Sequence, residues 1–170
     1  MDRVVALFAL ASALAVAGAP VFAADPPDAS FYKQAAEGGI AEVQAGRLAQ
    51  EKSSNGQVKD FGAMMVKDHT TAGEHLKELA DAKGIKLPDT SSDEQAADRA
   101  KLELLTGDSF DHSYIKGQIT AHEDTIALLK KEIASGKDPD AKAFAQRILP
   151  TVRTHLNVIN AVAAASGDSK

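Results

Sequence analysis

The stretch from Val58 to Lys83 constrains the fold most strongly, because it has the pattern of one long amphipathic helix. At 100° per residue, its apolar and small residues gather in a single stripe: Val58, Gly62, Met65, Gly73, Leu76 and Ala80. His69 falls in the middle of that stripe, so a helix that buries this face also buries an imidazole. A buried polar group without a partner costs about 1–3 kcal/mol. The sequence therefore predicts that other segments supply a partner for His69.

Three further segments have the same long amphipathic pattern. We expect them from Phe31 to Lys52, from Ser109 or Phe110 to Ser135, and from Pro139 to about Ala165. A shorter helix is expected from Glu94 to Leu105, and no segment shows the alternation typical of strands. Short turns join the first helix to the second and the third to the fourth, which makes each pair antiparallel neighbours. The prediction is an all-α four-helix bundle with a longer central connection that contains the short helix.

Glycines lie on the inward face of the first predicted helix. Gly39 and Gly46 both fall among its small and apolar residues. A glycine has no side chain, so each would let another helix or a metal site come close.

The N-terminus has the features of a signal peptide. A short charged start precedes an apolar run from Val4 to Ala17, and Val21-Phe22-Ala23 supplies small residues at the positions that a signal peptidase requires. We expect cleavage after Ala23, an extended lead-in over residues 24–30 and the bundle domain over residues 31–166. The protein would then be periplasmic or otherwise exported. No later run approaches the length that a membrane-spanning segment needs.

The composition excludes several classes of function. The chain of 170 residues has no cysteine, which rules out thiolate metal sites, disulfide bonds and cysteine nucleophiles. Its net charge is −5 and it has no basic stripe, so nucleic acid is not an expected partner. It also lacks the G-x-S-x-G turn of a serine hydrolase and a phosphate-binding glycine loop, and we expect no organic cofactor.

Each long helix places one candidate metal ligand on its inward face: Glu42, His69, His122 and His155. At about 1.5 Å per residue, these side chains lie roughly 18 to 25 Å from the turns that join the helix pairs. All four are therefore expected near the middle of the bundle. Because His122 is also near the middle of its own helix, this holds whether the central connection stays at one end or crosses the bundle.

Three imidazoles and one carboxylate would suit one Zn²⁺ ion, and copper or iron would also be compatible. His75 and His112 are expected to point outward, whereas Met64 and Met65 are expected to fill the core. Asp111 is too far along its helix from His122 to share the site, and we interpret it as a cap or salt-bridge partner.

Two alternatives remain open. Glu42 and the three histidines could form a metal-free hydrogen-bond network that fixes the packing of a structural or interaction module. The same site with an open coordination position could also serve a hydrolase or an oxidoreductase. The leading hypothesis is a non-catalytic exported protein that binds one metal ion, for metal handling or envelope stress protection. Association with the envelope is compatible with this sequence, which leaves the oligomeric state open.

Several strings resemble a known family. These are the segments Gly38–Ala49, Val58–His69, Phe110–Ile115, Gln118–His122 and Leu149–Leu156. They are similar, in the same order, to the bacterial exported family called domain of unknown function 4142. The resemblance implies a ferritin-like fold, and members of the family are often described as outer-membrane or periplasmic proteins. Its biochemical role is not established.

The ferritin-like resemblance does not extend to a di-iron site. Such a site needs Glu-x-x-His on two helices and one glutamate from each of the other two. The residues three positions before the histidines are Val66, Ile119 and Val152. Three of the required carboxylates are therefore missing, and the resemblance concerns architecture rather than iron chemistry.

Overall fold

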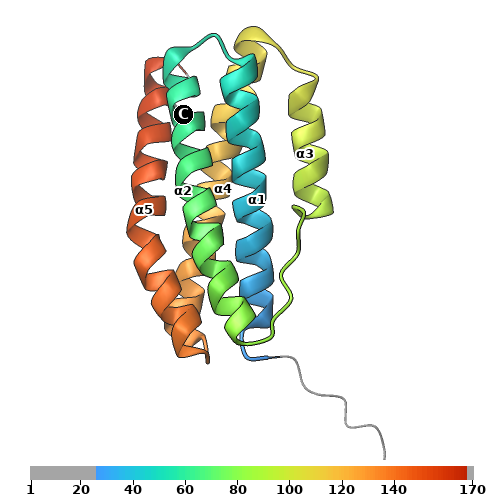
Figure 1. The fold of residues 1–170 in the computed structure, drawn as a ribbon. Coiled ribbons are helices and arrows are strands. Elements are labelled where there is room, and N and C mark those ends of the chain that lie inside the picture. Colours follow the sequence, from blue (N-terminus) through green and yellow to red (C-terminus); the bar gives the residue numbers. More distant parts are fainter. Residues whose placement is uncertain (1–25, 168–170) are drawn as a thin grey trace, which may run out of the picture.

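The computed structural model describes residues 26–167, which contain five α-helices and no strand. They are α1 (Ala29–Lys52), α2 (Gly56–Ala82), α3 (Asp93–Glu103), α4 (Gly107–Ser135) and α5 (Pro139–Ala165). The four long helices lie side by side, and α3 lies outside them against α1 (Figure 1). The predicted four-helix bundle is confirmed. The predicted signal peptide and its cleavage site lie outside the described residues.

Local sequence signals explain where the helices begin and end. The Asn55 side chain accepts a hydrogen bond from the backbone N–H of Gln57 at the start of α2. Ser92 and Gln95 form a capping box at the start of α3, each side chain bonding to the other's backbone N–H. The chain leaves α2 through Gly84, whose φ of 67° favours a residue without a side chain.

The central connection crosses the whole bundle. From the end of α2 the chain runs back beside α1 through α3, so that α4 begins at the end where α2 begins (Figure 1). As a result α2 and α4 run parallel, whereas α1 and α2 form one antiparallel pair and α4 and α5 form the other. The topology that the sequence left open is therefore settled.

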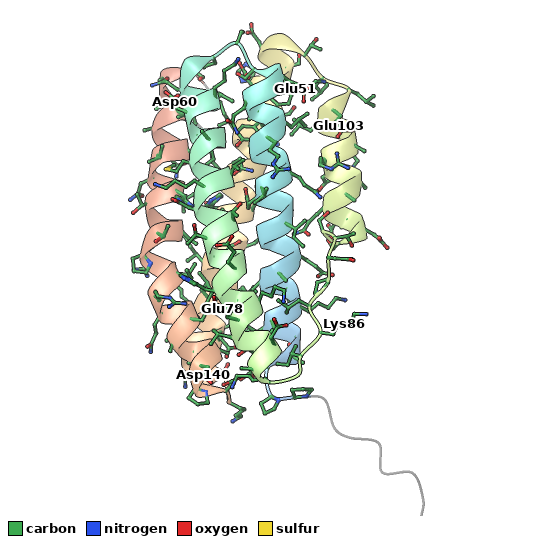
Figure 2. The ribbon with its side chains drawn as sticks, viewed as in Figure 1. Glu51, Asp60, Glu78, Lys86, Glu103 and Asp140 are labelled. Atoms are coloured by element: carbon green, nitrogen blue, oxygen red, sulfur yellow. The ribbon has the colours of Figure 1, made fainter. Side chains whose placement is uncertain are left out.

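The core consists of two hydrophobic clusters, one in each half of the bundle. The lower cluster, near the end of α2, includes Phe31, Tyr32, Leu76, Leu129, Phe144 and Val152. The upper cluster, near the start of α2, includes Val58, Phe61, Met65, Phe110, Tyr114 and Ile159. Charged side chains such as Glu51, Asp60 and Glu78 project from the outside of the bundle (Figure 2). The middle of the bundle, between the two clusters, is where the predicted ligands lie.

Helices α1 and α2 touch backbone to backbone at Gly46 and Gly62. A Cβ atom added to Gly62 would lie 2.6 Å from the carbonyl oxygen of Gly46, and one added to Gly46 would lie 2.6 Å from the carbonyl oxygen of Gly62. The close approach expected at Gly46 is confirmed. At Gly39 no helix approaches, because an added Cβ atom would meet nothing within 4 Å.

Candidate metal centre

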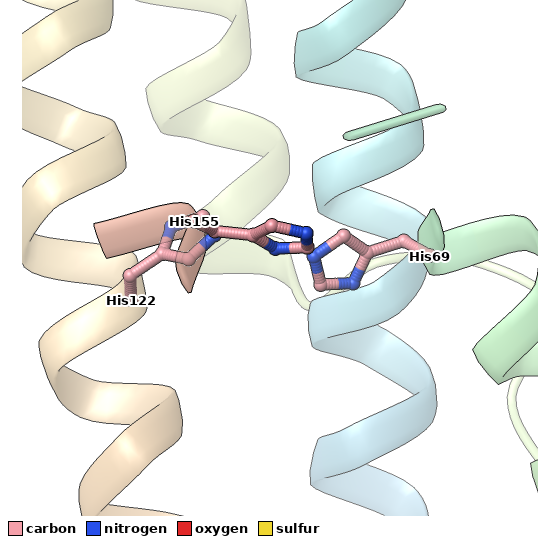
Figure 3. A group of neighbouring side chains, drawn as sticks. All are labelled: His69, His122 and His155. Atoms are coloured by element: carbon pink, nitrogen blue, oxygen red, sulfur yellow. The ribbon is translucent and has the colours of Figure 1, made fainter. Parts of the chain in front are cut away.

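Three histidines from three helices meet in the middle of the bundle. His69 comes from α2, His122 from α4 and His155 from α5, and their rings face one another (Figure 3). The ring centroids are 6.0 Å apart for His69 and His122, and 5.5 Å apart for each of the other two pairs. One ring nitrogen from each residue lies within 4.8 Å of the other two. We call these three residues the histidine triad.

One ring nitrogen of each triad residue has no hydrogen-bond partner. These nitrogens are Nε2 of His69, Nε2 of His122 and Nδ1 of His155, and all three atoms are buried. The pKa of His69 is lowered to about 3 and that of His122 to about 4, mainly by burial and to a smaller extent by the neighbouring histidines. These two imidazoles are therefore neutral at physiological pH. A neutral imidazole with a free lone pair is the form that binds a metal ion.

Hydrogen bonds orient two of the rings. Nδ1 of His122 lies 2.8 Å from the carbonyl oxygen of Gln118, to which it donates, so its lone pair is on Nε2. Nε2 of His155 lies 3.0 Å from Oδ2 of Asp68, which leaves the lone pair on Nδ1. Each of these two rings thus keeps one nitrogen free of protein partners. Carbonyl and carboxylate partners of this kind fix histidine ligands around bound metal ions.

Asp68 is a residue that the sequence analysis missed. It lies next to His69, but about 100° from the centre of the apolar stripe on the same helix. The contact with His155 depends on α5 packing beside that flank of α2, which a helical pattern does not reveal. The only signal for it in the sequence was its position as an acidic residue directly before His69.

Glu42 lies beside the triad but not among its converging nitrogens. Glu42 is 5% exposed as a whole residue, and its Oε1 is 3.9 Å from Nδ1 of His122, the nitrogen that already donates to the Gln118 carbonyl oxygen. Burial raises the pKa of Glu42 to about 7, and a hydrogen bond from the Gln118 side chain offsets part of that shift. Because the pKa of His122 is lowered to about 4, both groups are largely neutral between about pH 4 and pH 7. This contact is therefore not a salt bridge in the metal-free protein.

The other predicted residues lie outside the triad. His112 is exposed and His75 is half-buried. Met65 belongs to the upper cluster and Met64 packs against it, so both fill the core as expected. Asp111 is buried near the start of α4, and its Oδ1 has no hydrogen-bond partner.

The sequence profile of the family described as Domain of unknown function (DUF4142) matches residues 11–162. The chain belongs to the DUF4142 family. The resemblance found in the sequence is thereby confirmed. A search of the curated proteins finds no match.

Two solved structures share the fold of this DUF4142 protein. One is a DUF305 protein from Streptomyces coelicolor, whose description proposes that it is secreted. It matches with a TM-score of 0.70 at 15% sequence identity, and the match covers 84% of this chain and 95% of that one. The other is a DUF305 fragment from Deinococcus radiodurans, with a TM-score of 0.72 at 15% identity, covering 82% of this chain and 99% of that one. At this identity the similarity shows the fold alone. None of the helices in residues 26–167 is long and apolar enough to cross a bilayer.

Proposed function

We propose that this DUF4142 protein binds one divalent transition-metal ion through His69, His122 and His155 and handles such ions outside the cytoplasm. Two observations carry the proposal: each histidine of the triad has a buried, unpartnered ring nitrogen, and the three residues bring ring nitrogens within 4.8 Å of one another. In a metal-free network each of these atoms would need a hydrogen-bond partner, at a cost of about 1–3 kcal/mol for each one left without. A metal ion would satisfy all three at once.

The chemistry of the donors favours Zn²⁺, Cu²⁺ or iron. Imidazole nitrogens bind all three metals, and three imidazole nitrogens with tetrahedral geometry suit Zn²⁺ best. In such a site the ligand nitrogens lie about 3.3 Å apart. Side-chain rotations that move each nitrogen by about 1 Å would bring the triad to bonding distance from one ion. The fourth coordination position is left for another ligand.

Two carboxylates balance the charge of a divalent ion. Asp68 bonds to His155, and Glu42 lies 3.9 Å from His122, so each carboxylate contacts one histidine of the triad. A bound cation would favour the ionised form of Glu42, which the metal-free core disfavours. Direct ligation by Glu42 stays a prediction. Its position beside Nδ1 of His122 supports charge compensation as its role in our proposal.

Export is the second part of the proposal. It is supported by the sequence of residues 1–23, which has the features of a signal peptide, and by the structurally similar Streptomyces coelicolor protein, whose description proposes that it is secreted. An exported metal-binding bundle would serve in metal handling or in protection of the envelope.

The test is a calorimetric titration of metal-free protein with Zn²⁺ and Cu²⁺. We expect one equivalent to bind, and the His69→Ala and His155→Ala variants to lose at least 100-fold in affinity. His75→Ala is the matched control, because it removes a histidine of α2 that lies outside the triad. Binding of one equivalent that survives both triad substitutions would exclude this ligand set, whereas no metal binding to the unsubstituted protein would favour the metal-free network.

A further inference from the structure

A cavity of about 700 Å³ lies in the lower half of the bundle, between α1 and α2. Residues of α4 and α5 and the segment of residues 85–89 also line it. Its walls are mostly apolar and include Ile40, Val43, Leu76, Phe144 and Ile148. Cavities of this size and lining are typical of small-molecule sites.

Small residues create this space. Gly39 on α1 and Gly73 on α2 both line the cavity, and a Cβ atom at either would meet nothing within 4 Å. The two helices that touch at Gly46 and Gly62 therefore leave open volume further down the bundle. The space can be filled by substitution without displacing the backbone.

The inner end of the cavity reaches the histidine triad. His69 itself lines the cavity. Thr125 and Val152 also line it, and each lies one helical turn from another triad member, His122 or His155. The cavity therefore adjoins the proposed metal site from below.

Cationic side chains lie around the cavity, although the chain as a whole carries a net charge of −5. Arg47, Lys77 and Lys86 line it, together with Asp81 and Asp89. Lys77 pairs with Asp81, whereas Arg47 and Lys86 form no ion pair with other residues in the described part of the chain. The excess of positive charge favours an anionic ligand over a cationic one.

We propose that the cavity binds an amphipathic monocarboxylate, whose apolar chain fills the cavity and whose carboxylate completes the coordination of the metal ion at the triad. This inference rests on the proposed function, because it requires an ion held by the three histidines. Apolar walls suit the chain, the open coordination position suits a carboxylate oxygen, and Arg47 and Lys86 favour the approach of an anion. The bound carboxylate also brings further negative charge to the buried ion.

The experiment uses the full mature protein loaded with Co²⁺, whose absorption spectrum reports its ligands, and decanoate below the concentration at which it forms micelles. Calorimetry and the cobalt spectrum are recorded in the same titration, with acetate as the short-chain comparison. We expect one decanoate to bind with a change in the cobalt spectrum, and acetate to bind at least 100-fold more weakly, because burial of each methylene group contributes to affinity.

Two variants that fill the cavity provide the structural test. Gly39→Leu and Gly73→Leu should each weaken decanoate binding at least tenfold while Co²⁺ affinity stays within twofold of wild type. Gly117→Leu is the matched control, since Gly117 also has open space around it but does not line the cavity. It should bind decanoate as wild type does.

The two proposals fail in different ways. If Co²⁺ binds at the triad but decanoate does not bind, binds equally well in both cavity variants, or leaves the cobalt spectrum unchanged, the cavity proposal is wrong and the metal site stands. If Co²⁺ itself does not bind at the triad, both proposals are wrong, whatever decanoate does in the calorimeter.

Discussion

Gly62→Ala should destabilise the protein, although alanine is the better helix former. The added Cβ atom would lie 2.6 Å from the Gly46 carbonyl oxygen and 3.0 Å from Cβ of Ala49, both on α1. A backbone oxygen cannot rotate away as a flexible side chain can, so α1 and α2 must separate by several tenths of an ångström. Overpacking of this kind costs roughly 1–3 kcal/mol, and the gain in helix propensity offsets about 1 kcal/mol. Because the contact is with the backbone, we expect the upper end of that cost and a net loss of about 2 kcal/mol.

The assay is urea unfolding followed by circular dichroism, with Gly39→Ala as the matched control. Gly39 is also a helical glycine on the inward side of this pair, but an added Cβ atom there meets nothing within 4 Å. Gly39→Ala should therefore gain up to about 1 kcal/mol in the free energy of unfolding. The reasoning is refuted if Gly62→Ala stabilises the protein as much as Gly39→Ala does.

Three further predictions concern the histidine triad. Asp68→Asn should weaken Zn²⁺ binding about 10- to 100-fold by calorimetry, because the carboxylate orients His155; unchanged affinity would show that this contact is incidental. Glu42→Gln should weaken Zn²⁺ binding by about tenfold yet stabilise the metal-free protein at pH 8, where an ionised carboxylate is costly to bury; a less stable variant at that pH would contradict this. In the metal-free protein, the pKa values of His69 and His122 are lowered to about 3 and about 4. The unfolded chain therefore takes up more protons than the folded one below pH 6.5. As a result, the contribution of these two residues to stability is lost as the pH falls from 6.5 toward 4. Glu42, whose pKa is raised to about 7, has the opposite effect on stability between pH 4.5 and 7. Urea unfolding of the protein should therefore be compared with that of a His69→Gln/His122→Gln variant, whose stability should fall less as the pH is lowered. An equal fall in the two proteins would contradict the prediction.

The fold was predictable because each long helix has a continuous inward stripe. The stripe that begins at Val58 becomes part of the buried core, as does the one on α5 that includes Ile159. The path of the central connection was not predictable, because His122 lies near the middle of its helix. The position of His122 along the bundle axis is therefore similar whether α4 runs parallel or antiparallel to α2.

The site was predictable as far as helical phase determines it. His69, His122 and His155 each lie on an inward stripe, and the structure brings all three together. Glu42 lies at the same height, but its helical phase does not fix which face of His122 it approaches. The contact from Asp68 depends on how α5 packs beside α2, which only the assembled bundle determines.

The glycines illustrate the same limit of a helical pattern. Gly39 and Gly46 occupy similar places on the inward face of α1, and the sequence gives no reason to distinguish them. In the folded protein Gly46 touches the backbone of α2, whereas Gly39 borders a cavity. The difference arises because α1 is in close contact with α2 at Gly46 but not at Gly39, and where two helices come into contact depends on packing across the whole pair.

The most direct test of the central claim is a crystal structure of the protein grown with Zn²⁺, with data collected at the zinc absorption edge. The account predicts one strong anomalous peak in the middle of the bundle, about 2.0–2.1 Å from Nε2 of His69, Nε2 of His122 and Nδ1 of His155. If the crystal shows no anomalous peak near those three nitrogens, and zinc is bound only elsewhere on the protein, the account is contradicted.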